Sequence, residues 1–246
     1  MAFSSAIEAC RVPDELLAGA YEGTSALHRS WIKTTLALAE AVFPALPSRS
    51  AVSIENRAAG FGSVRTETAA PWTVLLIGAG YASAVRLAAA IMPARLAGVE
   101  PIIAVWTGKP EAAPSALFAA LELTGVEQVF AMPDPAPLLG ELPGQGRVLA
   151  FGAADVPPLP CPCWRDRAPR IAADALPDET LVRWAHPDAL PDTDGADVAY
   201  AGQIVIGDAG EPLVLGPGLE GCWLHAELTP AFFMNTRLEL SVADAD

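Results

Sequence analysis

The pattern of apolar and polar residues is clearest between Thr73 and Met132. Three short apolar runs, at Thr73–Ile77, Pro101–Trp106 and Gln128–Met132, alternate with two longer segments of helical character. The runs are continuous rather than alternating, which is typical of strands buried on both faces of a parallel sheet. This order predicts three neighbouring parallel strands, because crossovers of this kind share a right-handed sense.

We therefore expect an α/β protein with a Rossmann-like, three-layer parallel sheet and helices on both faces. The run Arg147–Phe151 predicts a fourth strand, and segment 197–216 predicts a small antiparallel hairpin around its Asp-Ala-Gly turn. Residues 1–155 are expected to form a first helix followed by the Rossmann-like core. Residues 156–246 are expected to add a Pro-rich arm, a short α/β extension and the hairpin, all packed on the core.

The chain before the core has helical periodicity. Apolar residues recur at three- and four-residue intervals over residues 14–43, which predicts one long amphipathic helix between Asp14 and Pro44. Its stripe is expected to pack on the core, and the alternative is contact with a neighbouring subunit in a homo-oligomer. His28 on this stripe is interpreted as a packing residue.

Four other segments carry weaker signals. Arg49–Ala70 is interpreted as a connection with a short strand at 51–54 and a loop at 59–63 that lies over a pocket. Residues 156–164 contain too many prolines for a helix or a central strand. Cys222–His225 predicts a short strand, Pro230–Met234 predicts a short helix or turn, and the tail from Ser241 is expected to be loose.

Composition limits the class of protein. At 246 residues with 52% hydrophobic residues, the chain can bury a large core. Its 15 basic and 29 acidic side chains give a net charge of −14, which disfavours nucleic acid as a partner. No apolar stretch reaches the roughly 20 residues of a membrane span, and the N-terminal segment lacks signal-peptide features. We expect a cytoplasmic protein with reduced cysteines and no membrane partner.

The turn after the first buried strand invites a dinucleotide interpretation. A Rossmann fingerprint is G-x-G-x-x-G, but this chain has Ser83 at the third position, after Gly78 and Gly80. No acidic residue follows the second strand, at Trp106-Thr107, where a ribose hydroxyl would need one. The motif therefore does not support NAD, the cofactor stays unknown, and a purely structural turn is the alternative.

Open α/β sheets bind ligands at the carboxyl ends of their strands. A small-molecule site is therefore expected beside the glycine turn and the end of the second strand, where backbone amides near Ser83 can bind an anion. The candidate binding residues are Gly78, Gly80, Tyr81, Ser83, Thr107 and Lys109.

No catalytic set can be derived from the sequence. There is no Gly-x-Ser-x-Gly elbow or phosphate-binding lysine loop, and the three histidines are dispersed. Cys161 and Cys163 form half of a zinc motif without a second ligand pair, so no metal site is predicted.

The segments IMPARLAGVEPII and ALFAALELTGVEQVFAM resemble the N-terminal half of histidinol dehydrogenases. Pro93–Val99 and Thr124–Val126 match the family's segments before its second and third strands, and Leu27-His28 is similar to the Phe-His of its long first helix. The resemblance covers residues 14–132, about half the chain. It implies a shared fold.

Departures from the family argue against shared catalysis. Leu76 replaces a tyrosine that contacts the nicotinamide cofactor, and residues 133–137 are proline-rich where the family has a Gly-Gly-Ala-Gln cofactor segment. No position matches the family's metal ligands or its Glu-His pair, and its members are nearly twice as long. The resemblance thus implies a ligand-binding relative without zinc- and NAD-dependent activity. The alternatives are an enzyme of altered, oxidoreductase-like chemistry and an assembly subunit.

Overall fold

The computed structural model describes residues 3–56, 58–158, 160–167, 171–172, 184–185, 187, 204–206, 213–216 and 218–242. Its centre is a five-stranded parallel sheet in the order β5-β4-β3-β6-β7. The strands are β3 (Thr73–Ile77), β4 (Ile102–Trp106), β5 (Gln128–Ala131), β6 (Arg147–Phe151) and β7 (Cys163–Arg165). The prediction of an α/β fold with three neighbouring parallel strands is confirmed, as is the fourth strand.

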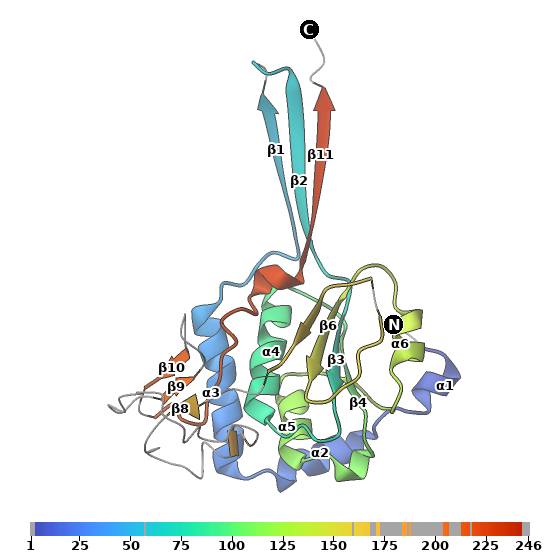
Figure 1. Cartoon of the computed structure of the whole chain (residues 1–246), viewed down its shortest axis with the longest axis vertical. Helices are drawn as coiled ribbons and strands as arrows, with labels where there is room; N and C mark the ends of the chain where they lie inside the picture. The colour runs from blue at the N-terminus through green and yellow to red at the C-terminus, as the bar shows by residue number, and fades with distance from the viewer. Residues whose placement is uncertain are drawn as a thin grey trace.

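Helices cover both faces of this sheet and make three layers (Figure 1). On one face lie α4 (Ala84–Leu96) and α5 (Ser115–Leu123), with α2 (Asp14–Gly23) and α3 (Ala26–Val42) packed outside them. On the other face lie the short helices α1 (Ser5–Glu8) and α6 (Ala136–Glu141). Strands β3, β4 and β6 are completely buried, which explains why their sequences do not alternate. The 3₁₀ turn η1 (Pro110–Ala112) precedes α5.

The prediction of one helix over residues 14–43 is wrong, because α2 ends at Gly23 and α3 begins at Ala26. The Ser25 side chain accepts a hydrogen bond from the His28 amide and so caps the start of α3. Ile32, Thr35 and Ala39 of the apolar stripe are buried inside the body. This part of the stripe packs on the core, as expected, whereas Leu27 and Val42 of α3 remain exposed. Contact with a neighbouring subunit through the stripe stays a prediction.

A second sheet projects from the body and is called the projecting sheet here (Figure 1). It consists of β1 (Arg49–Asn56), β2 (Phe61–Ala69) and β11 (Met234–Val242), all antiparallel, with β2 in the centre. The expected pocket loop at 59–63 is wrong, because this segment is the tip of the β1–β2 hairpin, far from the body. The expected loose tail at Ser241 is also wrong as far as Val242, where β11 still pairs with Phe61.

Other C-terminal expectations have mixed outcomes. The hairpin is confirmed, since β9 (Ile204–Ile206) pairs antiparallel with β10 (Leu213–Leu215), and β8 (Ile171–Ala172) joins them. The turn η2 (Pro230–Phe233) docks on the core as expected, with Phe233 fully buried. The proline-rich segment nevertheless supplies β7, which is possible because β7 is an edge strand. Residues 222–225 form no strand.

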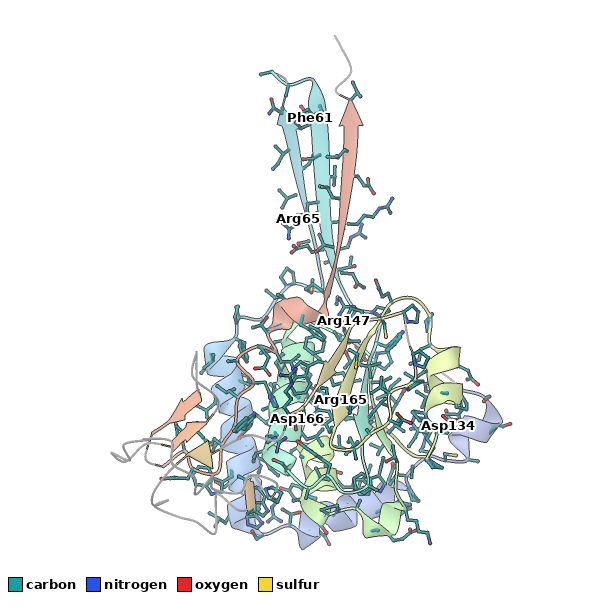
Figure 2. The ribbon with its side chains drawn as sticks, viewed as in Figure 1. Phe61, Arg65, Asp134, Arg147, Arg165 and Asp166 are labelled. Carbon is teal, nitrogen blue, oxygen red and sulfur yellow. The ribbon has the colours of Figure 1, made fainter. Side chains whose placement is uncertain are left out.

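Arg147 connects the body to the projecting sheet (Figure 2). Its guanidinium donates hydrogen bonds to the carbonyl oxygens of Phe232 (2.6 Å) and Met234 (2.8 Å) and to Oδ1 of Asn235 (2.9 Å). Only 4% of Arg147 is exposed, and burial lowers the pKa of its guanidinium. Because Arg147 begins β6 and its acceptors lie at the start of β11, this one side chain fixes where β11 leaves the body.

We predict that Arg147→Met lowers the free energy of unfolding by about 3–5 kcal/mol, because it leaves several buried acceptors without a charged donor. Urea denaturation measures the loss. Arg237→Met is the matched control, since Arg237 is exposed and forms a surface ion pair with Glu239 (2.9 Å). The control should change stability by less than about 0.5 kcal/mol. Equal effects of the two substitutions would contradict the anchoring role.

Candidate functional site

The strand order places a switch point between β3 and β6. From β3 the chain crosses to β4 and then β5 on one side, and β6 returns to pair with the other side of β3. In open α/β sheets the crevice outside the carboxyl ends at such a point is the usual ligand site. We therefore consider the carboxyl edge of the sheet first.

Main-chain atoms of the loop after β6 fill the crevice beside Gly78. A Cβ built on Gly78 would lie 2.8 Å from the Ala154 amide nitrogen and 3.1 Å from the Phe151 carbonyl oxygen. The Gly78 amide donates to that same carbonyl oxygen at 3.0 Å. This glycine is required because two backbone segments meet there. The contact accounts for the glycine without any ligand.

A buried ion pair occupies the space beyond the glycine turn. Arg86, in the first turn of α4, donates to Oδ2 of Asp166, which directly follows β7, and both side chains are 1% exposed. The Tyr81 hydroxyl donates to the same carboxylate oxygen at 2.8 Å. The guanidinium also donates to the carbonyl oxygen of Arg167 at 3.2 Å. Several donors thus compensate the cost of burying the carboxylate.

His225 extends this arrangement. Its Nδ1 accepts a hydrogen bond from Nε1 of Trp223 (3.1 Å), so the proton of the neutral ring is on Nε2, which donates to the Arg86 carbonyl oxygen (3.0 Å). The pKa of His225 is lowered to about 4, mainly by burial and to a smaller extent by the charge of Arg86, while the hydrogen bond to the Arg86 carbonyl oxygen and the charge of Glu227 oppose the shift. Both ring nitrogens are engaged, so His225 is a structural residue here. Tyr81, Arg86, Asp166, Trp223 and His225 are called the buried polar network below.

The candidate binding residues divide into two groups. Gly78, Tyr81 and Ser83 are buried, and the Ser83 hydroxyl donates to the carbonyl oxygen of Ala185. Gly80 and Lys109 are exposed, and Thr107 is half-buried. A Cβ on Gly108 would lie 3.0 Å from Cβ of Ala79, so the loops after β3 and β4 touch. The structure thus brings all six candidates to one edge of the sheet.

Sequence reasoning missed Arg86, Asp166 and the packing role of His225. Arg86 is surrounded in α4 by apolar residues, and the only other charged residue of this helix is Arg95 in its last turn. This isolation is a signal that the charge of Arg86 is buried with a partner. The partner is 80 residues away in the sequence, and no local pattern identifies it.

The described part of the chain offers little else for chemistry. A hollow of about 400 Å³ lies at the opposite, amino edge of the sheet, between the end of α4 and the starts of β4 and β5. Its arginine, Arg95, donates to the carbonyl oxygen of Gly125 at 2.6 Å. No three His, Cys, Asp or Glu side chains among the described residues are grouped as a metal ion would require. No described helix is long and apolar enough to span a membrane.

The projecting sheet presents an unusual surface. On the central strand β2, Arg65 pairs with Val52 on one side and Leu238 on the other. In the same way Ser63 pairs with Ile54 and Leu240, and Phe61 pairs with Asn56 and Val242. Residues paired across strands share a face. All six large apolar residues in these rows therefore lie on one side, called the apolar face below: Val52, Ile54, Phe61, Leu238, Leu240 and Val242.

These six side chains are between 46% and 85% exposed, and they are six of the eight exposed large hydrophobic residues in the described part of the chain. Together they present roughly 600 Å² of apolar surface, at the upper end of the largest patch on a typical monomer. The opposite face carries mainly polar residues, including Ser53, Thr66, Glu239 and Ser241. In Figure 2, Phe61 marks the tip of this sheet and Arg65 its middle.

Comparison with known proteins gives limited information. No family model matches the chain, and no curated protein sequence is similar to it. Among solved structures, the histidinol dehydrogenase from Elizabethkingia anophelis is similar, with a TM-score of 0.47 and 15% sequence identity over 59% of this chain. The similar region spans only 35% of that enzyme. The chain therefore resembles part of a histidinol dehydrogenase weakly.

We predict that stability depends on His225 at acidic pH. Because folding lowers the pKa of His225 from 6.5 to about 4, the unfolded chain binds more protons between these values. Stability therefore falls as pH drops through that window, by up to about 3 kcal/mol. Urea denaturation at pH 7 and pH 4 should show a smaller loss for His225→Gln than for the wild type.

The matched variant His28→Gln should keep most of the stability loss that the wild type shows between pH 7 and pH 4, because His28 is only half-buried. Its ring stacks on that of Trp184, with the ring centroids 3.9 Å apart. Parallel stability curves for the wild type and His225→Gln would contradict this account.

Proposed function

We propose that this protein is an assembly subunit that binds a protein partner through the apolar face of the projecting sheet. One observation carries the proposal: six exposed, large apolar side chains share a single face of one sheet. A sheet with an apolar face is stable when that face packs against another layer. The described part of the body supplies no such layer, since the sheet extends away from it (Figure 1).

The rest of the molecule supports this role as a rigid base. The crevice between β3 and β6 is filled by backbone and by the buried polar network. Much of the apolar stripe of α2 and α3 is buried inside the body, including Leu17, Ile32 and Ala39. We therefore assign the assembly role to the projecting sheet instead of to the first helical region.

We predict that Leu240→Asp abolishes partner binding and that Ser241→Asp does not. The two positions are neighbours on the same strand, the substitutions add the same charge, and the side chains lie on opposite faces. Each tagged full-length variant is purified from the cells that naturally make the protein, together with wild type.

The expected result is a stoichiometric partner, whether another protein or an untagged copy of this chain, that is retained by Ser241→Asp and lost with Leu240→Asp. Circular dichroism must show the same fold for both variants. Equal binding by the two variants, or no partner for the wild type, would refute the proposal.

A second candidate function is small-molecule binding at the carboxyl edge. It is favoured by the contact between the loops after β3 and β4, where Gly80 and Lys109 are exposed and no atom would obstruct a Cβ on Gly80. An anionic small molecule is the ligand class that Lys109 would select. Zinc- and NAD-dependent oxidation of histidinol is not part of this proposal, because the residues for it have no counterparts in the sequence.

The measurement is a thermal-shift panel of nucleotides, imidazole compounds and small carboxylates. We expect at least one anion to raise the melting temperature by about 2 °C or more, since a ligand that binds only the folded state stabilises it. Lys109→Ala should remove the shift, whereas Lys33→Ala, which deletes an exposed lysine on α3, should preserve it. No shift with any compound would eliminate this candidate.

A further inference from the structure

The charges of the projecting sheet differ from those of the whole chain. Its three strands contain three arginines and three glutamates, so their net charge is zero, whereas the chain carries −14. The charged residues are Arg49, Glu55, Arg65, Glu67, Arg237 and Glu239. The sheet is therefore a neutral surface on a strongly acidic protein.

On the apolar face itself the charges are also balanced. Arg65 and Glu67 point to this face from the central strand and form an ion pair with each other at 2.6 Å. A partner selected by charge would need a surface with a net charge to bind, and the charges of this face compensate each other. The face is complementary to another neutral, apolar, flat sheet surface.

We infer that the partner is a second copy of this chain, and that the two apolar faces stack to form a closed, two-fold symmetric dimer. This inference rests on the proposed function and specifies its partner. The faces of two copies would bury roughly 1,200 Å² of apolar surface, which reaches the range of specific interfaces. Sheets that stack in this way pack about 10 Å apart.

The shape of the molecule fixes the direction of stacking. The body has three layers, whereas the projecting sheet has one, so two sheets about 10 Å apart with both bodies at one end would bring the bodies into collision. The sheets must therefore run in opposite directions, with the bodies at opposite ends. This arrangement also separates the two acidic bodies, which reduces their repulsion.

A two-fold axis across the middle of the sheet then determines which rows meet. The row of Val52, Arg65 and Leu238 in each copy faces the row of Ile54, Ser63 and Leu240 in the other. Leu238 of one copy lies opposite Leu240 of the other, and this contact occurs twice. Such an interface is isologous and closed, so it ends at two copies.

The test uses the purified full-length chain in sedimentation equilibrium. Wild type and Ser241→Asp should have twice the chain mass of 25.6 kDa, while Leu240→Asp and Leu238→Arg should each raise the dissociation constant at least about 30-fold, as loss of a central apolar contact does. Circular dichroism confirms that each variant is folded.

Mixing the variants tests the arrangement. A mixture of Leu238→Arg with Leu240→Asp should restore a dimer. In the mixed dimer the new arginine of one copy faces the new aspartate of the other, and the second opposed pair remains Leu–Leu. The control mixture, Leu240→Arg with Leu240→Asp, should not, because these positions do not face each other. Rescue by the control instead would overturn the antiparallel arrangement.

A wild-type monomer at about 100 µM, far above the dissociation constants of ordinary specific dimers, would overturn the inference. So would self-association that Leu240→Asp leaves unchanged. If the purified chain is a monomer but still captures a different protein from its native cells in a Leu240-dependent way, the dimer is wrong and the assembly function stands. If neither occurs, both fail.

Discussion

The arrangement of this molecule depends on a buried arginine that must find acceptors. Arg147 opens a fully buried strand, so its guanidinium cannot be solvated by water and instead donates to backbone carbonyl oxygens of residues 232 and 234. Those carbonyls lie at the junction of η2 and β11. One desolvated charge thus sets the point at which the last strand leaves the body. Because β11 pairs with β2 along its whole length, the same contact orients the entire projecting sheet.

At the carboxyl edge of the sheet, side chains that could act in catalysis are occupied by hydrogen bonds within the protein. A histidine, a tyrosine, an aspartate and an arginine converge there, which is a set that could act in acid–base chemistry. Each instead forms a hydrogen bond within the structure: Tyr81 and Arg86 with Asp166, and His225 with Trp223 and the Arg86 carbonyl oxygen. A base needs a free lone pair that faces a substrate, and His225 has none. The network is best understood as the packing that closes the switch point.

Sequence reasoning succeeded where the signal was local and continuous. The buried strands β3, β4 and β6 and the glycine stops at Gly98 and Gly125, both with positive φ, follow from residue type and spacing alone. It failed where the outcome depended on distant partners. The break at Ser25 is an exception, because Gly23 and the capping Ser25 are local signals for it. It was missed because the apolar period continues across it without interruption.

The projecting sheet was missed for a different reason. The alternation Leu238, Leu240, Val242 was present in the sequence, and Val52 and Ile54 alternate in the same way. Each run is short, however, and they become one surface only when β11 pairs with a strand more than 160 positions earlier. Of the candidate site, the edge was predictable from the strand–helix order. The pairing of Arg86 with Asp166 was not, because β7 arises from a proline-rich segment.

The apolar face is informative because the free energy forgone by leaving it exposed is large. Leaving roughly 600 Å² of apolar surface in water forgoes about 15 kcal/mol relative to burial, as large as the net stability of a typical domain. The same chain buries the three central strands of its parallel sheet, β3, β4 and β6, completely, with helices on each side. It also places arginine and glutamate in equal numbers on the three strands, so the surrounding negative charge does not extend to them. A sheet that is apolar on one side, neutral overall and held away from an acidic body has the properties of half an interface, and a second such sheet supplies the missing layer.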